Sequence, residues 1–298
     1  MNSTVKSVDK CRYFGYVGPE TMDARSVLVY DQGEAAPYSV DGLVACARRA
    51  VSSVSEPIVV KKVSDLDLES EAAFTGVLAF CMPGGRSTDF RKALQTGDRV
   101  KNLVNFVRSG GIYLSVCGGS YLACTNVCFD LGGVNERIVR DGGLNFFSGI
   151  GRGPLFPNFS YASSDVHAVP ICPTEQQSDE IVTYYCGGCW FEEIEHQPNT
   201  VEVLAHYRDR DARPAIIRCK VDKGQAILCG PHLEYDPSVA QKQYDECVAR
   251  CGSYEGPMES EVGQAELKAS LKRIVDAGAA GQDFLVLLLS NALRKRTG

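Results

Sequence analysis

The segment Gly110–Ala123, GGIYLSVCGGSYLA, holds the residues best suited to chemistry. A continuous apolar run leads into Cys117, a predicted helix follows, and Ser115 and Gly119 are the residues two positions before and two after the cysteine. This spacing is typical of a nucleophile elbow, because strand and helix pass closely only where both flanking side chains are small. The N-terminus of the following helix would stabilise a thiolate. The spacing therefore predicts that Cys117 is a nucleophile.

One of the four histidines, His232, has the position that such a thiol needs. It lies in Cys229–Glu234, CGPHLE, directly after a predicted strand over 225–229, and Glu234 follows two residues later. Ligands gather at the carboxyl ends of parallel strands, and Cys117 and His232 each lie just past such an end. We expect His232 to serve as the base and Glu234 to hold the imidazole tautomer, which completes a Cys-His-Glu triad.

Other residues are candidates for binding at the same cleft. Gly84 and Gly85 end a further predicted strand and would present N–H groups to an oxyanion, as would Gly118 directly after the cysteine. Arg152 lies in a predicted Gly/Pro-rich loop, where it either faces the cleft and binds a carboxylate or phosphate, or is simply solvated. Tyr185 is expected to form part of the cleft wall.

Cys186 and Cys189 form a Cys-x-x-Cys motif. A redox pair or half of a zinc site are two interpretations, but zinc would need two more ligands, such as Cys172 and His196, to converge there. A glycine turn near the cleft is the simpler interpretation. We predict no metal and no cofactor.

The elements that position these residues alternate between apolar strands and amphipathic helices. Strands that are apolar on both faces are typical of a parallel sheet covered by helices on both sides, so the fold class is α/β. Shorter strands follow residue 130, after a segment over 141–160 that is dominated by Gly, Pro and Phe. The predicted strands are 26–30, 58–63, 76–82, 112–116, 166–171, 180–185, 201–207, 215–221 and 225–229, and the predicted helices of this part are 40–51, 65–73 and 99–108.

These elements indicate one α/β domain over residues 26–298, preceded by a flexible N-terminal arm over 1–25. We expect a polar insertion near 241–263 and two C-terminal helices over 264–295.

Composition excludes several classes of protein. The chain has 298 residues, 44% hydrophobic and 23% charged, so it is not a disordered chain. Its net charge of −6 comes without a basic face, which argues against nucleic-acid binding, and its longest apolar run, Phe284–Leu289, is far shorter than the roughly 20 residues that cross a bilayer. The 13 cysteines without an apolar signal segment indicate reduced thiols and a cytoplasmic location.

An ordered set of segments resembles the amidotransferase-like N-terminal region of eukaryotic biotin-protein ligases, in the class I glutamine amidotransferase-like superfamily. The resemblance covers about residues 26–290. It implies a flavodoxin-like fold, mainly a parallel sheet with helices on both faces, and puts Cys117, His232 and Glu234 in the triad positions. The segments are Val27–Tyr30 with Ser39-Val40, Met82–Arg86, Gly110–Tyr121, Gly151–Pro154 with Phe156–Phe159, Tyr184–Gly188, and the segment around His232.

The chain departs from true glutamine amidotransferases at two places. Ser115 stands where they usually have Gly, and Ser120-Tyr121 where a Gln follows the nucleophile, a difference that bears on glutamine recognition.

Three functional hypotheses follow. The first is an accessory or regulatory module without ligase activity of its own, because the Gly/Arg-rich loop of the ligase catalytic domain is not found. Its partner would be a biotin ligase or a biotin-dependent carboxylase, with a small-molecule ligand in the Cys117 cleft. The alternative is a cysteine hydrolase or amidase that acts on a small amide or ester through an acyl-enzyme. A redox sensor at Cys117 is the third.

Overall fold

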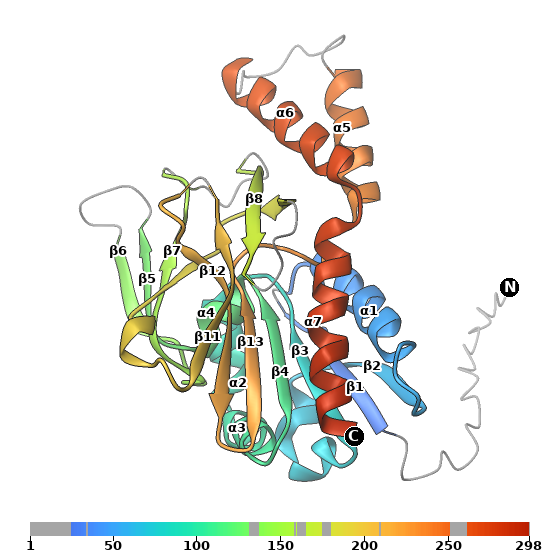
Figure 1. The fold of residues 1–298 in the computed structure, drawn as a ribbon, viewed down its shortest axis with the longest axis vertical. Helices are drawn as coiled ribbons and strands as arrows, with labels where there is room; N and C mark the ends of the chain where they lie inside the picture. Colours follow the sequence, from blue (N-terminus) through green and yellow to red (C-terminus); the bar gives the residue numbers. More distant parts are fainter. Residues whose placement is uncertain are drawn as a thin grey trace, which may run out of the picture.

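A computed structural model describes residues 25–33, 35–130, 137–157, 159, 165–174, 180–208, 210–250 and 261–297. The expected N-terminal arm lies outside the described residues except for Arg25, which begins the first strand. A large sheet with helices on both faces, a small sheet and a further helix pair make up the described part (Figure 1).

The large sheet has nine strands. All neighbours from β2 to β13 are parallel, and all neighbours from β13 to β9 are antiparallel. The α/β prediction is therefore confirmed, with a parallel half that carries the predicted site and an antiparallel half beyond it. In spatial order the strands are β2 (Ile58–Val63), β1 (Arg25–Tyr30), β3 (Val77–Met82), β4 (Ile112–Val116), β13 (Gly224–Cys229), β12 (Pro214–Val221), β11 (Val201–Tyr207), β8 (His167–Pro173) and β9 (Ile181–Tyr185).

Helices cover both faces of the parallel half. The alternation of side chains along β1 shows this directly, because Val27 and Val29 pack in the core under α1 and α7, whereas Leu28 and Tyr30 pack in the core under α2 and α3. A strand that is buried on both sides must be apolar throughout, which is why the sequence pattern was informative here. The helices are α1 (Pro37–Val51) and α7 (Ala280–Thr297) on one face, and α2 (Ser87–Leu94), α3 (Arg99–Arg108) and α4 (Gly118–Ala123) on the other.

The remaining helices lie at and next to the expected polar insertion near 241–263. Helix α5 (Pro237–Arg250) takes up the first part of it, and residues 251–260 lie outside the described residues. Helix α6 (Glu261–Ala277) packs against α5 and against β8 and β9, and the pair extends beyond the sheet at the top of Figure 1. The break between α6 and α7 at Gly278, with φ +60°, confirms the two predicted C-terminal helices.

The small sheet was not predicted. It lies beside α4, and its strand β7 occupies part of the segment that was expected to be loop. The glycines of β7 are required by close packing, since a Cβ at Gly151 would lie 2.8 Å from Cys124 Sγ and one at Gly153 only 1.9 Å from Tyr121 Oη. In spatial order the strands are β10 (Trp190–Glu192), β7 (Phe147–Gly153), β5 (Cys124–Asp130) and β6 (Arg137–Asp141).

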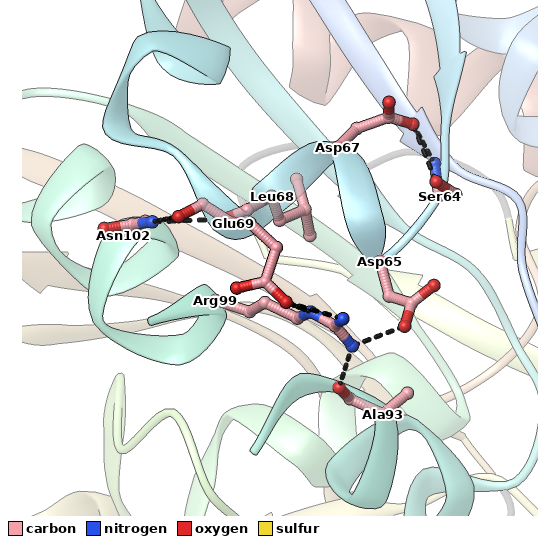
Figure 2. Close-up of polar contacts among 8 residues, drawn as sticks. All are labelled: Ser64, Asp65, Asp67, Leu68, Glu69, Ala93, Arg99 and Asn102. Atoms are coloured by element: carbon pink, nitrogen blue, oxygen red, sulfur yellow. Dashed lines mark hydrogen bonds and ion pairs between the residues drawn. The ribbon is translucent and has the colours of Figure 1, made fainter. Parts of the chain in front are cut away.

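The predicted helix over 65–73 is instead two 3₁₀ turns, η1 (Leu66–Glu69) and η2 (Glu71–Phe74). Figure 2 shows how α3 holds them. Arg99 forms ion pairs with Asp65 and, at 2.6 Å, with Glu69. The Asn102 amide donates to two backbone carbonyls of η1, at 3.0 and 2.9 Å. These contacts fix backbone groups that a continuous α-helix would use internally.

A third 3₁₀ turn, η3 (Ile194–His196), precedes β11. No helix of the described part is long and apolar enough to cross a membrane.

Candidate active site

Cys117 lies at a strained turn between β4 and α4. Its backbone has φ 45° and ψ −109°, a conformation that non-glycine residues rarely adopt, and its N–H donates to Cys229 O at 2.9 Å. A Cβ at Gly118 would lie 2.0 Å from Gly85 O, so only glycine fits directly after the cysteine. The turn therefore has the geometry that the elbow spacing predicts.

His232 reaches the thiol because β13 pairs in parallel with β4 and ends beside it. Two backbone contacts with β9 hold the histidine in place. The His232 N–H donates to Tyr184 O at 2.9 Å, and Thr183 Oγ1 donates to His232 O at 2.8 Å. His232 Nδ1 lies 2.8 Å from Glu234 Oε1, and the imidazole lines the same cavity as Cys117, whose thiol donates to Cys186 O at 3.5 Å. Since Nδ1 faces the carboxylate, Nε2 is the ring nitrogen left for the thiol.

The imidazole of His232 is 1% exposed, and Glu234 is fully buried. Burial alone lowers the pKa of His232, but the electronegative groups of Tyr38, Glu234 and Cys117 outweigh it and hold that pKa well above its ordinary value. We attribute the rise chiefly to the Glu234 carboxylate, because burial also raises the pKa of Tyr38 and keeps its phenol neutral. An imidazolium beside Cys117 would stabilise a thiolate.

Gly84 has a different contact from the one that the sequence predicts. Its N–H donates to Ser39 Oγ at 2.8 Å, and Ser39 Oγ donates to Glu234 Oε1 at 2.5 Å. A Cβ at Gly84 would lie 2.3 Å from the His232 ring, so the glycine lets the strand end pack against the imidazole. Gly84 therefore supports the carboxylate behind the histidine and does not offer its N–H to an oxyanion.

A cavity of about 250 Å³ opens above the thiol. Cys117 and His232 both line it, and Cys117 is 6% exposed. Cys186 lines the same cavity, but burial raises the pKa of its thiol to about 12, which distinguishes it from a reactive cysteine. The described residues around the cavity are Ala36, Tyr38, Gly85, Arg86, Ser87, Thr88, Cys117, Tyr121, Phe129, Arg140, Phe159, Cys186, Gly187 and His232.

Known proteins similar to this chain confirm its family. The sequence profile described as "Biotin-protein ligase, N terminal" matches residues 25–271. The chain belongs to this family. An uncharacterized protein of Chlamydia muridarum is 31% identical over 231 residues, which cover 76% of this chain and 87% of that protein.

The biotin–protein ligase of Schizosaccharomyces pombe is 35% identical over 177 residues. The match covers 58% of this chain and 27% of that ligase.

Two solved structures of glutamine amidotransferases are similar to this member of the ligase N-terminal family. One aligns over 74% of this chain and 97% of its own, with a TM-score of 0.48 and 16% identity. The other, from Thermotoga maritima, aligns over 91% and 97%, with a TM-score of 0.48 and 10% identity.

Two binding residues that the sequence predicts lie outside the cavity wall. Tyr185 is buried in the core, where its hydroxyl donates to Gly188 O at 2.7 Å and accepts the N–H of Leu155. Arg152 lies in β7, not in a loop, and pairs with Glu192 at 2.7 Å. The expectation for Arg152 fails because the small sheet, which was not predicted, determines where β7 lies. The expectation for Tyr185 fails because this last residue of β9, in the large sheet, packs its side chain in the core.

The Cys-x-x-Cys pair is divided between two environments. Cys186 lines the cavity, whereas Cys189 is fully buried in the core under α2 and α3. The described residues contain no group of three or more side chains that could hold a metal ion.

Four residues of the site were missed as functional candidates. Ser39 and Arg86 fall within the segments that carry the family resemblance, so a signal for them was present. Tyr38 contacts the His232 ring at a centroid distance of 5.7 Å and precedes Ser39, in the first turn of α1. Arg140 comes from β6, and no sequence pattern indicated it.

Proposed function

We propose that this member of the biotin-protein ligase N-terminal family is a cysteine-dependent acyl-transfer enzyme that hydrolyses a small amide or ester. The observation that carries the proposal is that Cys117 and His232 line one open cavity, with His232 Nδ1 2.8 Å from Glu234 Oε1 behind it. A nucleophile, a base and an orienting carboxylate in one series are what covalent acyl transfer requires.

In the first half-reaction, the Cys117 proton moves to His232 Nε2 and the sulfur attacks the substrate carbonyl carbon. The bond from that carbon to the amine or alcohol then breaks, and the proton on Nε2 passes to the departing group. A thioester remains on Cys117. In the second half-reaction, Nε2 takes a proton from water as the water oxygen attacks the thioester. The C–S bond breaks, the proton on Nε2 passes to the Cys117 sulfur, and a carboxylic acid leaves.

The oxyanion of each tetrahedral intermediate needs N–H donors beside the sulfur. The amides of Gly85 and Gly118 are the candidates, since the two backbones are in contact and neither N–H has a hydrogen-bond acceptor within the described part of the chain. With the Gly84 amide committed to Ser39, Gly85 and Gly118 are the two of the three predicted oxyanion glycines that are left for this role.

The test uses p-nitrophenyl acetate as the ester probe. We expect a burst of p-nitrophenol, an acetyl group on Cys117 by mass spectrometry, and loss of both in Cys117→Ala. Cys172→Ala is the matched control, because Cys172 is half-exposed in β8 and does not line the cavity, and it should keep both signals. Acetylation of Cys117 at the rate of an ordinary free thiol would refute the proposal.

A second candidate function is an accessory contact with a biotin ligase in the cytoplasm, and the similarity to part of the Schizosaccharomyces pombe ligase favours it. We expect the full chain to co-purify with a biotin ligase, or with a biotin-dependent carboxylase, from a cell that contains both. Cys117→Ala should retain the complex, because the contact would not need the thiol. Co-purification with neither protein would exclude this role.

A further inference from the structure

A second cavity, of about 710 Å³, lies at the end of the large sheet opposite Cys117. Residues at the start of β4 and β13 form part of its wall, whereas Cys117 directly follows the last residue of β4. Its volume is within the range of about 300–1,000 Å³ that is typical of small-molecule sites. The second cavity is therefore separate from the one above the thiol and large enough to hold a ligand of its own.

Strand β12 changes from apolar to basic along the face that borders this cavity. Ile216 packs in the core under α1 and α7, and Arg218 and Lys220 follow on the same face and line the cavity. On the neighbouring strand β13, Gln225 pairs with Lys220 and lines the cavity as well. These strands belong to the antiparallel half, in which one face of a sheet can be open to water. A ligand in the second cavity therefore meets charged and polar side chains.

Positive charge exceeds negative charge in this wall. Five basic and two acidic residues line the second cavity, although the whole chain carries a net charge of −6. Both acidic residues already have partners, since Glu202 pairs with Arg218 at 2.6 Å and Asp222 with Arg108 at 3.6 Å. Three lysines of the wall form no ion pair with any described residue, namely Lys220, Lys223 and Lys295. An anion could therefore bind to these lysines without displacing a carboxylate of the described wall.

Arg296, near the end of α7, adds a guanidinium that is held in place. Its Nη1 donates to Leu78 O and its Nη2 to Val77 O, each at 3.0 Å, and Nη1 also donates to Gly110 O. These acceptors are neutral carbonyls, so the guanidinium is fixed without an acidic partner. Three neutral polar side chains of the wall make no hydrogen bond within the described part of the chain, namely Ser109, Asn199 and Gln225. They can donate to the anion that the cations attract.

From these observations we propose that the second cavity binds a small molecule that carries phosphate groups. Lysine is a point charge on a flexible stem, and several lysines can reach separate oxygens of one group, which suits phosphate. A phosphate monoester also has close to two negative charges at neutral pH, so it gains more from several cations than a carboxylate does. The site does not use the thiol, and the inference is therefore independent of the proposed function.

Calorimetric titration of the full chain with sodium tripolyphosphate, at constant ionic strength, tests the proposal. We expect saturable binding of one tripolyphosphate per chain. Lys220→Gln and Lys223→Gln, at exposed positions where the fold should tolerate them, should each weaken binding about fivefold, the upper end for exposed charge pairs. Lys61→Gln is the matched control, because Lys61 is also exposed, forms no ion pair with a described residue, and lies in β2, outside the cavity. It should keep the wild-type affinity.

Titrations with ATP and with adenosine distinguish the sources of the phosphate groups. Tighter binding of ATP than of tripolyphosphate would identify a nucleotide, equal binding would identify the phosphate groups alone, and both results support the proposal. Absence of saturable binding, binding of adenosine as tight as that of ATP, or the same affinity in all three lysine variants would overturn it. Protection of Cys117 from iodoacetamide by tripolyphosphate, with unchanged affinity in Lys220→Gln and Lys223→Gln, would place the anion in the other cavity and overturn it too.

Discussion

The parallel half of the large sheet and the small sheet contribute to the same cavity by different means. The parallel half provides Cys117 and His232, each directly after a strand that is buried on both faces. The small sheet provides Phe129 and Arg140 from strands with no continuous apolar pattern. The proposed reactive groups therefore follow strands that are apolar on both faces, and the other two cavity residues come from strands without that pattern.

This difference has a physical cause. Neighbouring parallel strands must end at the same edge of the sheet, so residues just past those ends meet whatever their separation along the chain. The position of Arg140 depends instead on pairing between β6 and β5 and on the hydrogen bond to Ser87. The first arrangement follows from a general rule of topology, and the second from particular contacts.

Removing the imidazole of His232 should have the largest effect on the reactivity of Cys117. His232→Gln is expected to slow alkylation of Cys117 by iodoacetamide at neutral pH about 100-fold, the lower end of the range for a positioned acid or base. The reason is that the raised pKa of His232 provides the positive charge that stabilises the thiolate. Peptide mass spectrometry at timed intervals gives the rate at this cysteine alone.

His167→Gln is the matched control, because His167 stacks on Phe156 at a centroid distance of 3.6 Å and does not line the cavity. It should leave the alkylation rate unchanged. Equal rates in the wild type and His232→Gln would show that the parallel half positions a histidine without activating the thiol.

Glu234→Gln should follow, with a smaller effect on the rate and a large effect on stability. The change leaves a buried imidazole without its carboxylate, a loss of about 3 kcal/mol for broken buried ion pairs. Urea denaturation of both proteins measures the difference. Glu202→Gln breaks the surface pair of Glu202 with Arg218, which is 2.6 Å long, and should cost less than about 1 kcal/mol. If Glu234→Gln left the free energy of unfolding unchanged, the carboxylate would only fill space.

The reactive half could be predicted from the sequence to the level of single residues. Each strand shows as an apolar run, the elbow shows as small residues around Cys117, and the structure brings His232 and Glu234 to that cysteine. Ser39 was not recognised as part of the site, since its role depends on α1 packing beside Glu234, where a Cβ at Gly42 would lie 2.2 Å from Glu234 O. Packing of that kind has no periodic signal.

The small sheet could not be predicted for a related reason. Glycine usually indicates a turn, yet in β7 it allows the strand to lie against Tyr121 and Cys124. With the strand missed, Arg152 was expected in a loop at the cleft, and Arg140 was not considered. Tyr185 was expected in the wall of the cleft, but it is the last residue of β9 and its side chain packs in the core.

The pH dependence of stability should distinguish the buried His232 from the half-buried His167. The pKa of His232 is raised on folding, so its contribution is fully present below about pH 6.5 and is lost as pH rises through the folded-state pKa. The difference in unfolding free energy between wild type and His232→Gln should therefore fall as pH rises, by at most about 1.4 kcal/mol per unit. Denaturation series from pH 6 to 9 check this.

Burial lowers the pKa of His167, so its contribution to stability depends on pH in the opposite direction. The difference in unfolding free energy between wild type and His167→Gln should grow as pH rises toward about 6.5. The same slope for both histidines would contradict the assigned environments.

Gly153→Ala should affect the side of the Cys117 cavity next to the small sheet. The added Cβ would lie 1.9 Å from Tyr121 Oη and 2.4 Å from Gly188 O, so the tyrosine or the strand must move, at a cost of about 1–3 kcal/mol for overpacking. Because Tyr121 lines the cavity, we expect the burst from p-nitrophenyl acetate to fall while His232 still activates the thiol toward iodoacetamide. Gly278→Ala adds a Cβ with nothing within 4 Å at φ +60° and should cost about 1 kcal/mol without changing either reagent's rate. An unchanged burst in Gly153→Ala would show that the small sheet takes no part in binding the ester.

The smallest effect on the cavity is expected from the cluster of Figure 2, which belongs to neither of its walls. Asn102→Ala removes two hydrogen bonds to carbonyls of η1 and should cost about 1–2 kcal/mol, the range for leaving buried acceptors unpaired. Ser64→Ala removes only an exposed contact with Asp67 and should cost less than about 0.5 kcal/mol. Both variants should alkylate Cys117 at the wild-type rate. Slower alkylation in Asn102→Ala would show that the parallel half transmits distant packing changes to the elbow, and positions at strand ends would then not suffice to define the reactive groups.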